Sequence, residues 1–514
     1  MKINKENYII LLTILLFRTT FLFTEAIFFN KEKSIEIEAR PIVELKNSSA
    51  EENKGHYSSD IKEAQQTNTF PIQNPEEHFQ KVSKEIKEEN LDSKELSLKD
   101  IGGSLNSVEI LEKLYNKTKT SDVLKVLIDK LLLDYQFEKA KFYIADLDIL
   151  KNSMISASSY FYTQINTLSI TDPQSMNKFM ALVDQMKYRS MISVDDHLFY
   201  QGLSKIWNKE YATVTEIFKQ IQSPVYKNII FQIDDAVMKF NNQKGVPAYY
   251  KDSLIALVMM KNGYFSIANK LAVESLLQNK DYILPYQVLA YSNFLTNNRE
   301  KAIENFYTLI SLDIENKNKY NFYIGVSQYW LEEYTKSILT LSQITGDPNY
   351  KIDAYRYLLL NYQKLDDDEK IVQIWQKLLG QNDLKESDFQ TFYDFVFFKD
   401  FANNQKNTIY KKYKQLAYDY VFACYEQFGQ VNDTCLYGEV GLNIANNNLE
   451  LVENNLLYLV EKYPQSHIFQ ALGDFYNNNK QQEKAKTYYL KAISLSKNIF
   501  QKKIIEQNLV DIME

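Results

Sequence analysis

The sequence predicts an all-α protein in which helical hairpins are stacked side by side as an α-solenoid. A small or apolar residue opens the second helix of successive hairpins at intervals of 34, 35 and 34 residues, at Ala268, Ala302, Ser337 and Ile371. Apolar residues three or four apart, the spacing of amphipathic helices, continue almost without a break from Leu105 onward. The 514 residues include only 13 Gly and 9 Pro, too few for the many turns of an all-β chain.

The chain begins with a hydrophobic segment. Lys2 precedes a mostly apolar run over residues 8–17, and Arg18 follows it. Ten residues are too few to span a bilayer, which needs about 20. The run does fit the core of a secretory signal, and the residues that end at Ala26 form a small-residue cleavage site. The sequence therefore favours a cleaved signal peptide.

An uncleaved anchor over residues 8–29 is the main alternative, although it would hold Arg18 and Glu25 in lipid. A plain cytosolic tail is a third. We expect residues 1–26 to be a signal peptide or signal anchor. Under either leading interpretation the body of the protein is extracytoplasmic, that is secreted, periplasmic or membrane-anchored, and residues 8–29 would be the tether in the anchored case.

Residues 27–104 form a polar and charged segment with no sustained apolar stripe. Such a composition buries too little apolar surface to offset the entropy lost on ordering. We expect a disordered linker here, with at most a weakly packed helix near residues 75–89.

Residues 105–383 are expected to form the main repeat array. Twelve positions before each residue that opens a second helix, the array should have a small residue where the two helices approach closely. Those positions hold Ala256, Ala290, Gly325 and Leu359. Because Leu359 is large, we expect looser or shifted packing in its hairpin.

Residues 384–432 interrupt this register. The stretch is rich in aromatic residues and, at about 49 residues, is too long for one unit of about 34. We interpret it as an irregular pair of longer helices that forms core, with an insertion that presents a binding face as the alternative. Cys424 and Cys435 could pair in an oxidising compartment. The sequence favours two small buried residues instead and leaves the question open.

Residues 433–514 should hold two further hairpins and a capping helix over residues 499–513. Residues 466–498 read as two amphipathic helices joined by a polar turn. Their order of large, Leu, Gly, Tyr, Ala, aromatic and Ala positions resembles the tetratricopeptide repeat, at Phe469, Leu472, Gly473, Tyr476, Ala485, Tyr489 and Ala492.

This resemblance implies a right-handed superhelix whose first helices line a concave groove. The family's groove positions fall on these residues: Tyr291, Phe294, Phe322, Tyr329, Trp330 and Arg356. Exposed aromatic residues would supply apolar contact area to a peptide or partner helix, and Arg356 could bind a carboxylate or a carbonyl. The alternative is that each aromatic residue packs between helices.

No catalytic, metal or cofactor site is expected. The four histidines lie far apart, and the motifs of zinc proteases, serine hydrolases and phosphate-binding loops are missing. The acidic runs at Asp195–Asp196 and at residues 366–369 fall where helices begin, so we interpret them as helix caps. The net charge of −7 indicates no general attraction to nucleic acid.

The sequence thus predicts a non-catalytic scaffold for protein–protein interaction, exported or membrane-tethered, with a protein or peptide as its partner. One alternative is a structural component of an envelope or cell-surface assembly. A less favoured one is an enzyme acting on cell-wall glycan, which would need two carboxylates about 5–10 Å apart in a cleft.

Overall fold

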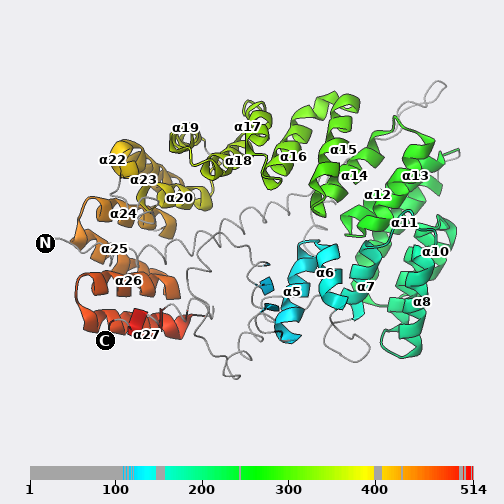
Figure 1. The fold of residues 1–514 in the computed structure, drawn as a ribbon, viewed down its shortest axis with the longest axis horizontal. Coiled ribbons are helices and arrows are strands. Elements are labelled where there is room, and N and C mark those ends of the chain that lie inside the picture. The colour runs from blue at the N-terminus through cyan, green and yellow to red at the C-terminus, as the bar shows by residue number, and fades with distance from the viewer. Residues whose placement is uncertain are drawn as a thin grey trace. The chain divides into compact units, whose positions relative to one another are not determined.

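A computed structural model describes residues 121–145, 157–241, 245–381, 383–398, 408–429 and 432–496, with scattered residues at 108–119 and 502–512. The expected signal segment and linker, residues 1–26 and 27–104, lie outside the described residues. The described part is helical and contains no strand, which confirms the predicted fold class (Figure 1). None of its helices is long and apolar enough to cross a membrane.

The described residues divide into two compact units, with the division between Ile344 and Thr345. In the first unit the helices are α5 (Ser121–Leu133), α6 (Phe137–Ala145), α7 (Ala157–Asn166), α8 (Ser175–Tyr188), α9 (Val194–Trp207), α10 (Tyr211–Phe218), η3 (Pro224–Tyr226), α11 (Lys227–Asn241), α12 (Ala248–Lys261), α13 (Phe265–Gln278), α14 (Ile283–Leu295), α15 (Arg299–Leu312), η4 (Ile314–Asn316), α16 (Lys317–Trp330) and α17 (Tyr334–Ser342).

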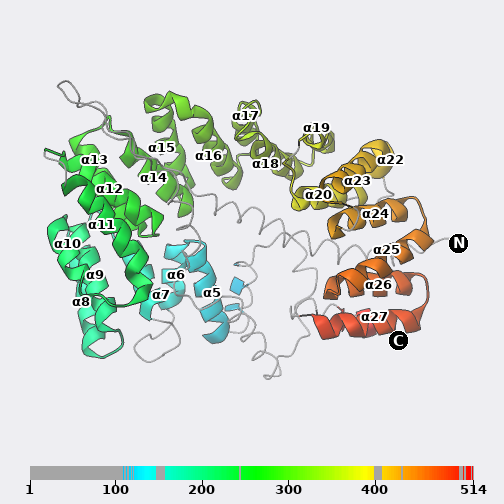
Figure 2. The same cartoon turned by 180° about the vertical axis from the view of Figure 1, so that it is seen from behind.

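From α12 to α17 these helices form three regular hairpins. Each helix packs against the next, and α12 also contacts α14, so neighbouring hairpins lie side by side (Figures 1 and 2). The residues that were expected to open the second helices, Ala268, Ala302 and Ser337, are fully buried on α13, α15 and α17. The predicted repeat register is confirmed in this unit.

The two helices of a hairpin are joined by a turn of one recurring form. In the α14–α15 turn, Asn297 has a φ of 63°, and the N–H of Asn298 donates to the carbonyl of Asn293. Bonds of this kind satisfy carbonyl groups that the end of a helix leaves unpaired. The same positive-φ position is found in the turns of other hairpins at Tyr135, Lys209, Gly263, Glu332, Asp366, Asn447 and Lys480. Glycine is the usual residue in this left-handed backbone conformation at the end of a helix. Of the positions named here, only Gly263 is a glycine; the others are residues with a side chain.

The first and second helices of several hairpins touch through a glycine and a large side chain. A Cβ added to Gly325 on α16 would lie 2.6 Å from Cγ of Leu341 on α17. Gly202 on α9 meets the ring of Phe218 on α10 in the same way. In both hairpins the large residue follows the glycine by sixteen positions. Because a Cβ would not fit, these contacts set how closely the two backbones approach.

The second unit contains α18 (Lys351–Lys364), α19 (Asp368–Leu379), α20 (Glu386–Tyr393), the π-helical turn η5 (Asp394–Phe398), α22 (Thr408–Lys412), α23 (Lys414–Phe428), α24 (Asp433–Ala445), α25 (Leu449–Lys462), α26 (Ser466–Asn478) and α27 (Gln482–Leu495). Ile371 is fully buried on α19, as the register predicts. Leu359 and Trp375, sixteen positions apart on α18 and α19, are both buried, and looser packing there stays a prediction.

The irregular stretch forms core, as the favoured interpretation held, but each of its two expected helices is divided. One continues from α20 into η5, and the other is split into α22 and α23 near Tyr413. The rings of Tyr393 and Phe397 fill the space that Gly438 and Gly441 leave on α24. The ring of Phe392 stacks on Tyr420 with 3.8 Å between centroids. Aromatic packing therefore replaces the regular hairpin contact here.

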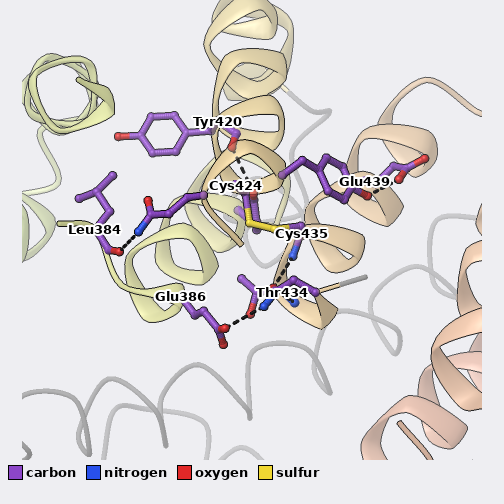
Figure 3. The surroundings of a disulfide bond; sticks show 11 residues. Leu384, Glu386, Tyr420, Cys424, Thr434, Cys435 and Glu439 are labelled. Atoms are coloured by element: carbon purple, nitrogen blue, oxygen red, sulfur yellow. Dashed lines mark hydrogen bonds between the residues drawn. A yellow bond between two sulfur atoms is a disulfide. The ribbon is translucent and has the colours of Figure 1, made fainter. Parts of the chain in front are cut away.

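Cys424 and Cys435 form a disulfide between α23 and α24, with their Cα atoms 5.5 Å apart (Figure 3). Both residues are fully buried, so the interpretation as small core residues describes their burial but not their bonding. Beside the bond, the side-chain amide of Gln427 donates to the carbonyl of Leu384 at 2.5 Å. Asn432 donates to Glu386 at 2.7 Å. The disulfide thus joins α23 and α24 next to hydrogen bonds that connect both helices to the residues around the start of α20.

Candidate interaction surface

The six residues that the sequence assigned to a groove are divided between the two units. Tyr291 and Phe294 lie on α14, while Phe322, Tyr329 and Trp330 lie on α16 of the same unit. Arg356 lies on α18 of the second unit. Their environments differ, and they are described in turn.

On α14, Tyr291 is fully buried. Its ring meets Phe306 and Tyr323 edge-on, with centroids 5.3 and 5.0 Å away. Phe294 is half-buried and meets Tyr323 edge-on at 5.1 Å. The guanidinium of Arg299 lies 4.3 Å from the centroid of Phe294. Tyr291 therefore helps to pack α14 against α16, and Phe294 keeps part of its ring accessible.

On α16 the three predicted groove residues differ in their exposure. Phe322 is half-buried, and Trp330 is 41% exposed. Tyr329 is buried, and its burial together with the nearby Tyr334 raises its pKa to about 12. The rings of Tyr329 and Trp330 meet edge-on at 5.4 Å. Trp330 is thus a large apolar side chain that packs edge-on against Tyr329 and leaves 41% of its surface exposed to solvent.

Contacts from α17 hold the backbone of α16, the helix that carries Phe322, Tyr329 and Trp330. The hydroxyl of Ser337 on α17 donates to the carbonyl of Gly325 at 2.8 Å, beside the contact between Gly325 and Leu341. Gly325 lies between Phe322 and Tyr329 on α16. We call Phe294, Phe322 and Trp330 the aromatic face; its members lie on helices that tertiary contacts hold in place.

Arg356 already has carboxylate partners within the chain. Its Nε and Nη2 donate to the two carboxylate oxygens of Asp388 at 2.8 and 2.6 Å, and its Nη1 donates to Asp353 at 2.6 Å. Burial lowers the pKa of Arg356, but the hydrogen bonds and charges of Asp388 and Asp353 raise it more, so the net shift is upward. Arg356 therefore connects α18 to α20, and its Nε, Nη1 and Nη2 atoms already donate hydrogen bonds within the chain. The sequence does not mark Asp388, 32 residues away, as the partner.

The acidic runs are helix caps, as predicted. Ser193 and Asp196 form a capping box at the start of α9, and Asp195 accepts the backbone N–H of Ser223 at 2.7 Å. His197 pairs with Asp184 at 2.7 Å. Asp367 caps α19 by accepting the N–H of Lys370. Within the described ranges, no group of three or more His, Cys, Asp or Glu side chains could hold a metal ion.

Comparison with known proteins identifies one repeat in the second unit. Residues 466–499 match the model of the tetratricopeptide repeat. Among solved structures, yeast Tom70 is 11% identical, with 76% of this chain and 95% of that chain covered and a TM-score of 0.31. Human IFIT1, solved as a dimer with m7Gppp-AAAA, is 12% identical, with 87% of each chain covered and a TM-score of 0.31.

A tetratricopeptide repeat protein from Parabacteroides merdae is 11% identical, with 62% of this chain and 99% of that chain covered and a TM-score of 0.25. No curated protein is significantly similar in sequence. In the matched repeat, a Cβ on Gly473 would lie 2.6 Å from the ring of Tyr489, the glycine-to-large-residue contact of the other hairpins. Residues 466–499 therefore match one tetratricopeptide repeat, and the contact within this repeat recurs in other hairpins of the chain.

Proposed function

We propose that this protein is a non-catalytic scaffold, exported or membrane-tethered, that binds an extended peptide or a partner helix through the aromatic face on α14 and α16. The tetratricopeptide fold suggests a protein-interaction scaffold. The observation that carries the finer proposal is Trp330, a tryptophan 41% exposed on a helix whose backbone is held by Gly325. Aromatic side chains are enriched among residues that dominate binding energy.

Two properties of the aromatic face favour binding. Its rings are large and apolar, so covering them removes considerable apolar surface from water. Its helices are already fixed by their hairpin contacts, so a partner would lose little affinity to ordering them. Arg299, stacked on Phe294, places a positive charge at one end of the surface, which would suit a partner with a carboxylate or carbonyl there.

Two observations support export. The sequence begins with a hydrophobic segment of signal type. The disulfide between Cys424 and Cys435 is of a kind that persists in oxidising compartments and is rare in the cytosol. N-terminal sequencing of the mature chain distinguishes an exported protein from a membrane-tethered one. A cleaved signal peptide would be missing from the mature chain, whereas an uncleaved anchor would still be present.

The test is recovery of a partner from the native membrane fraction by the full chain and its variants. Trp330→Ala and Phe322→Ala should each reduce recovery at least about tenfold, the range of an interaction hot spot, while circular dichroism shows an unchanged fold. The matched control is Tyr307→Ala on α15, an aromatic residue 53% exposed outside the aromatic face, which should leave recovery unchanged.

Full recovery with both variants would overturn the aromatic face as the binding surface. If the variants instead changed the molar mass of the protein in light scattering, the chain would be a component of a larger assembly.

A further inference from the structure

The turn between α9 and α10 is held by residues of α12 and α13. Nζ of Lys209 in this turn lies 3.0 Å from Oδ2 of Asp252 on α12 and 2.6 Å from Oε2 of Glu274 on α13. The hydroxyl of Tyr211 donates to Oδ1 of Asp252 at 2.7 Å. Because α11 lies between the two hairpins in the sequence, these contacts join elements that do not follow each other directly.

Glu274 lies between two lysines. Besides its contact with Lys209, its Oε1 accepts a hydrogen bond at 2.6 Å from Nζ of Lys270, one turn earlier on α13. Lys270 also donates to the carbonyl of Trp207, at the end of α9, at 2.9 Å. One carboxylate therefore neutralises an ammonium group from the turn and another from α13. We call Lys209, Asp252, Lys270 and Glu274 the ionic clasp.

The carboxylate of Glu274 can exchange a proton with the solvent, because its side chain is 28% exposed, whereas that of Asp252 is 2% exposed. Burial raises the pKa of Glu274, but the hydrogen bonds and charges of Lys209 and Lys270 lower it more, so its net pKa lies below the usual 4.5. A carboxylate with a lowered pKa stabilises the fold above about pH 4.5, and this contribution is lost as pH falls through the lowered pKa.

The other groups around Glu274 do not replace its charge once it is protonated. Tyr211 faces it from the turn, and burial raises the pKa of this tyrosine well above its usual range, so the hydroxyl stays neutral. Asp252 on α12 shares Lys209 with Glu274. The helices α7 and α14 also pack against α13, and neither contains an acidic or basic residue. Glu274 is therefore the carboxylate that lies between Lys209 and Lys270.

We propose that Glu274 makes the ionic clasp acid-sensitive, so that uptake of a proton by its carboxylate releases the turn between α9 and α10 from α13. Protonation leaves the ammonium groups of Lys209 and Lys270 on either side of a neutral group, and like charges repel each other strongly in a partly dehydrated site. This conformational device goes beyond the function proposed above and uses no residue of the aromatic face, so either proposal can fail while the other stands.

The test is hydrogen exchange of the full chain, followed by mass spectrometry of its peptides. Glu274→Gln replaces the carboxylate with a neutral group of the same shape and so imitates the protonated state. At pH 7 the backbone amides of residues 208–218 should exchange at least about tenfold faster in Glu274→Gln than in the natural chain, because local opening of the turn exposes them. The amides of α16, which lie outside the ionic clasp, should exchange at the same rate in both chains.

The pH profile separates an acid-sensitive contact from a merely structural one. With rates corrected for intrinsic exchange, the difference between Glu274→Gln and the natural chain should close as pH falls below about 4.5, because the natural chain then takes up the proton that glutamine imitates. The matched control is Glu210→Gln, at an exposed glutamate of the same turn that pairs with Lys205 at 2.7 Å. This substitution should leave the exchange of residues 208–218 close to that of the natural chain.

Circular dichroism checks the fold of each variant. If Glu274→Gln does not fold, the natural chain decides the question alone: its exchange over residues 208–218 should accelerate more than that of α16 as pH falls through about 4. The proposal is overturned if Glu274→Gln exchanges as the natural chain does at pH 7, if α16 accelerates as much as the turn, or if the difference between the two chains persists at low pH. In each of these cases the ionic clasp is no acid-sensitive device.

Discussion

The ring of Tyr489 lies so close to Gly473 that a Cβ on the glycine would be 2.6 Å from Cδ1 of the tyrosine. Sixteen positions separate the two residues, and the same separation joins Gly202 to Phe218 and Gly325 to Leu341. In each hairpin the missing side chain of the first helix makes room for a large one on the second. The closeness of the two helices therefore depends on these glycines.

Gly473→Ala should destabilise the last hairpin. Alanine favours a helix over glycine by about 1 kcal/mol, but the added methyl group overlaps a ring that is fully buried and bonded to Asp474. Overpacking of this kind costs about 1–3 kcal/mol, so a net loss is expected. Urea unfolding followed by circular dichroism measures it. The control is Gly380→Ala, where a Cβ would meet nothing within 4 Å. Equal effects of the two substitutions would contradict the assigned contact.

Ala302→Leu tests how closely the two helices of another hairpin, α14 and α15, approach each other. The substitution is on the second helix of this hairpin. Ala302 is fully buried on α15, where the hairpin with α14 leaves no room for a larger group. We expect a loss of about 1–3 kcal/mol in the free energy of unfolding. Lys301→Leu places the same side chain on the neighbouring exposed position and should change stability little. An unchanged thermal midpoint for Ala302→Leu would show that the repeat register is shifted there.

The repeat register was predictable because it depends on residue size at fixed intervals. Ala268, Ala302, Ser337 and Ile371 are buried where the spacing placed them, since each hairpin buries the same position against its own partner helix. The caps at Asp196 and Asp367 were predictable for a similar reason, because a cap is a contact within four residues. Features that depend on nearby residues or on a fixed spacing can therefore be predicted from the sequence.

Contacts between distant residues could not be predicted in this way. Nothing near Arg356 indicates that Asp388 will use its donors, and nothing near Tyr291 indicates that Tyr323 will cover it. Phe397, which meets Gly441, lies in a π-helical turn that has no periodic signature in the sequence. The burial of Gln470 and Asp474 was missed for the same reason, although two polar residues one turn apart among buried apolar positions were a visible signal.

Reduction of the disulfide should weaken the second unit. The bond closes a short loop between α23 and α24, and a native disulfide of this kind contributes about 2–4 kcal/mol. We expect the urea midpoint of the natural chain to fall when dithiothreitol is added. The double variant Cys424→Ala and Cys435→Ala should have the lower midpoint with or without the reductant. A natural chain that is indifferent to dithiothreitol would show that the two thiols are not bonded in the folded protein.

Arg356→Ala should destabilise the contact between α18 and α20. The substitution leaves the buried carboxylate of Asp388 without the two hydrogen bonds it now accepts from the guanidinium. Breaking one side of such a pair costs about 3 kcal/mol. The double variant Arg356→Met and Asp388→Leu removes both charges and should recover most of the loss. If the single and double variants were equally unstable, the cost would come from packing and not from the unpaired carboxylate.

Asp474→Asn should raise the thermal midpoint at neutral pH and have little effect near pH 4. Burial raises the pKa of Asp474 well above 3.8, and the hydrogen bonds from Tyr489 and Asn508 only partly oppose this. The folded chain therefore keeps a proton that the unfolded chain releases, and this group's contribution to stability falls as pH rises from about 4 toward the raised pKa. Asparagine does not titrate, so the variant escapes that fall. The exposed Asp172, whose pKa is lowered by Lys178, is the control of opposite sign. Asp172→Asn should be less stable than the natural chain above about pH 4, and this difference should shrink as pH falls below that value. A difference between Asp474→Asn and the natural chain that did not change with pH would show that the carboxyl group is ionised in the fold.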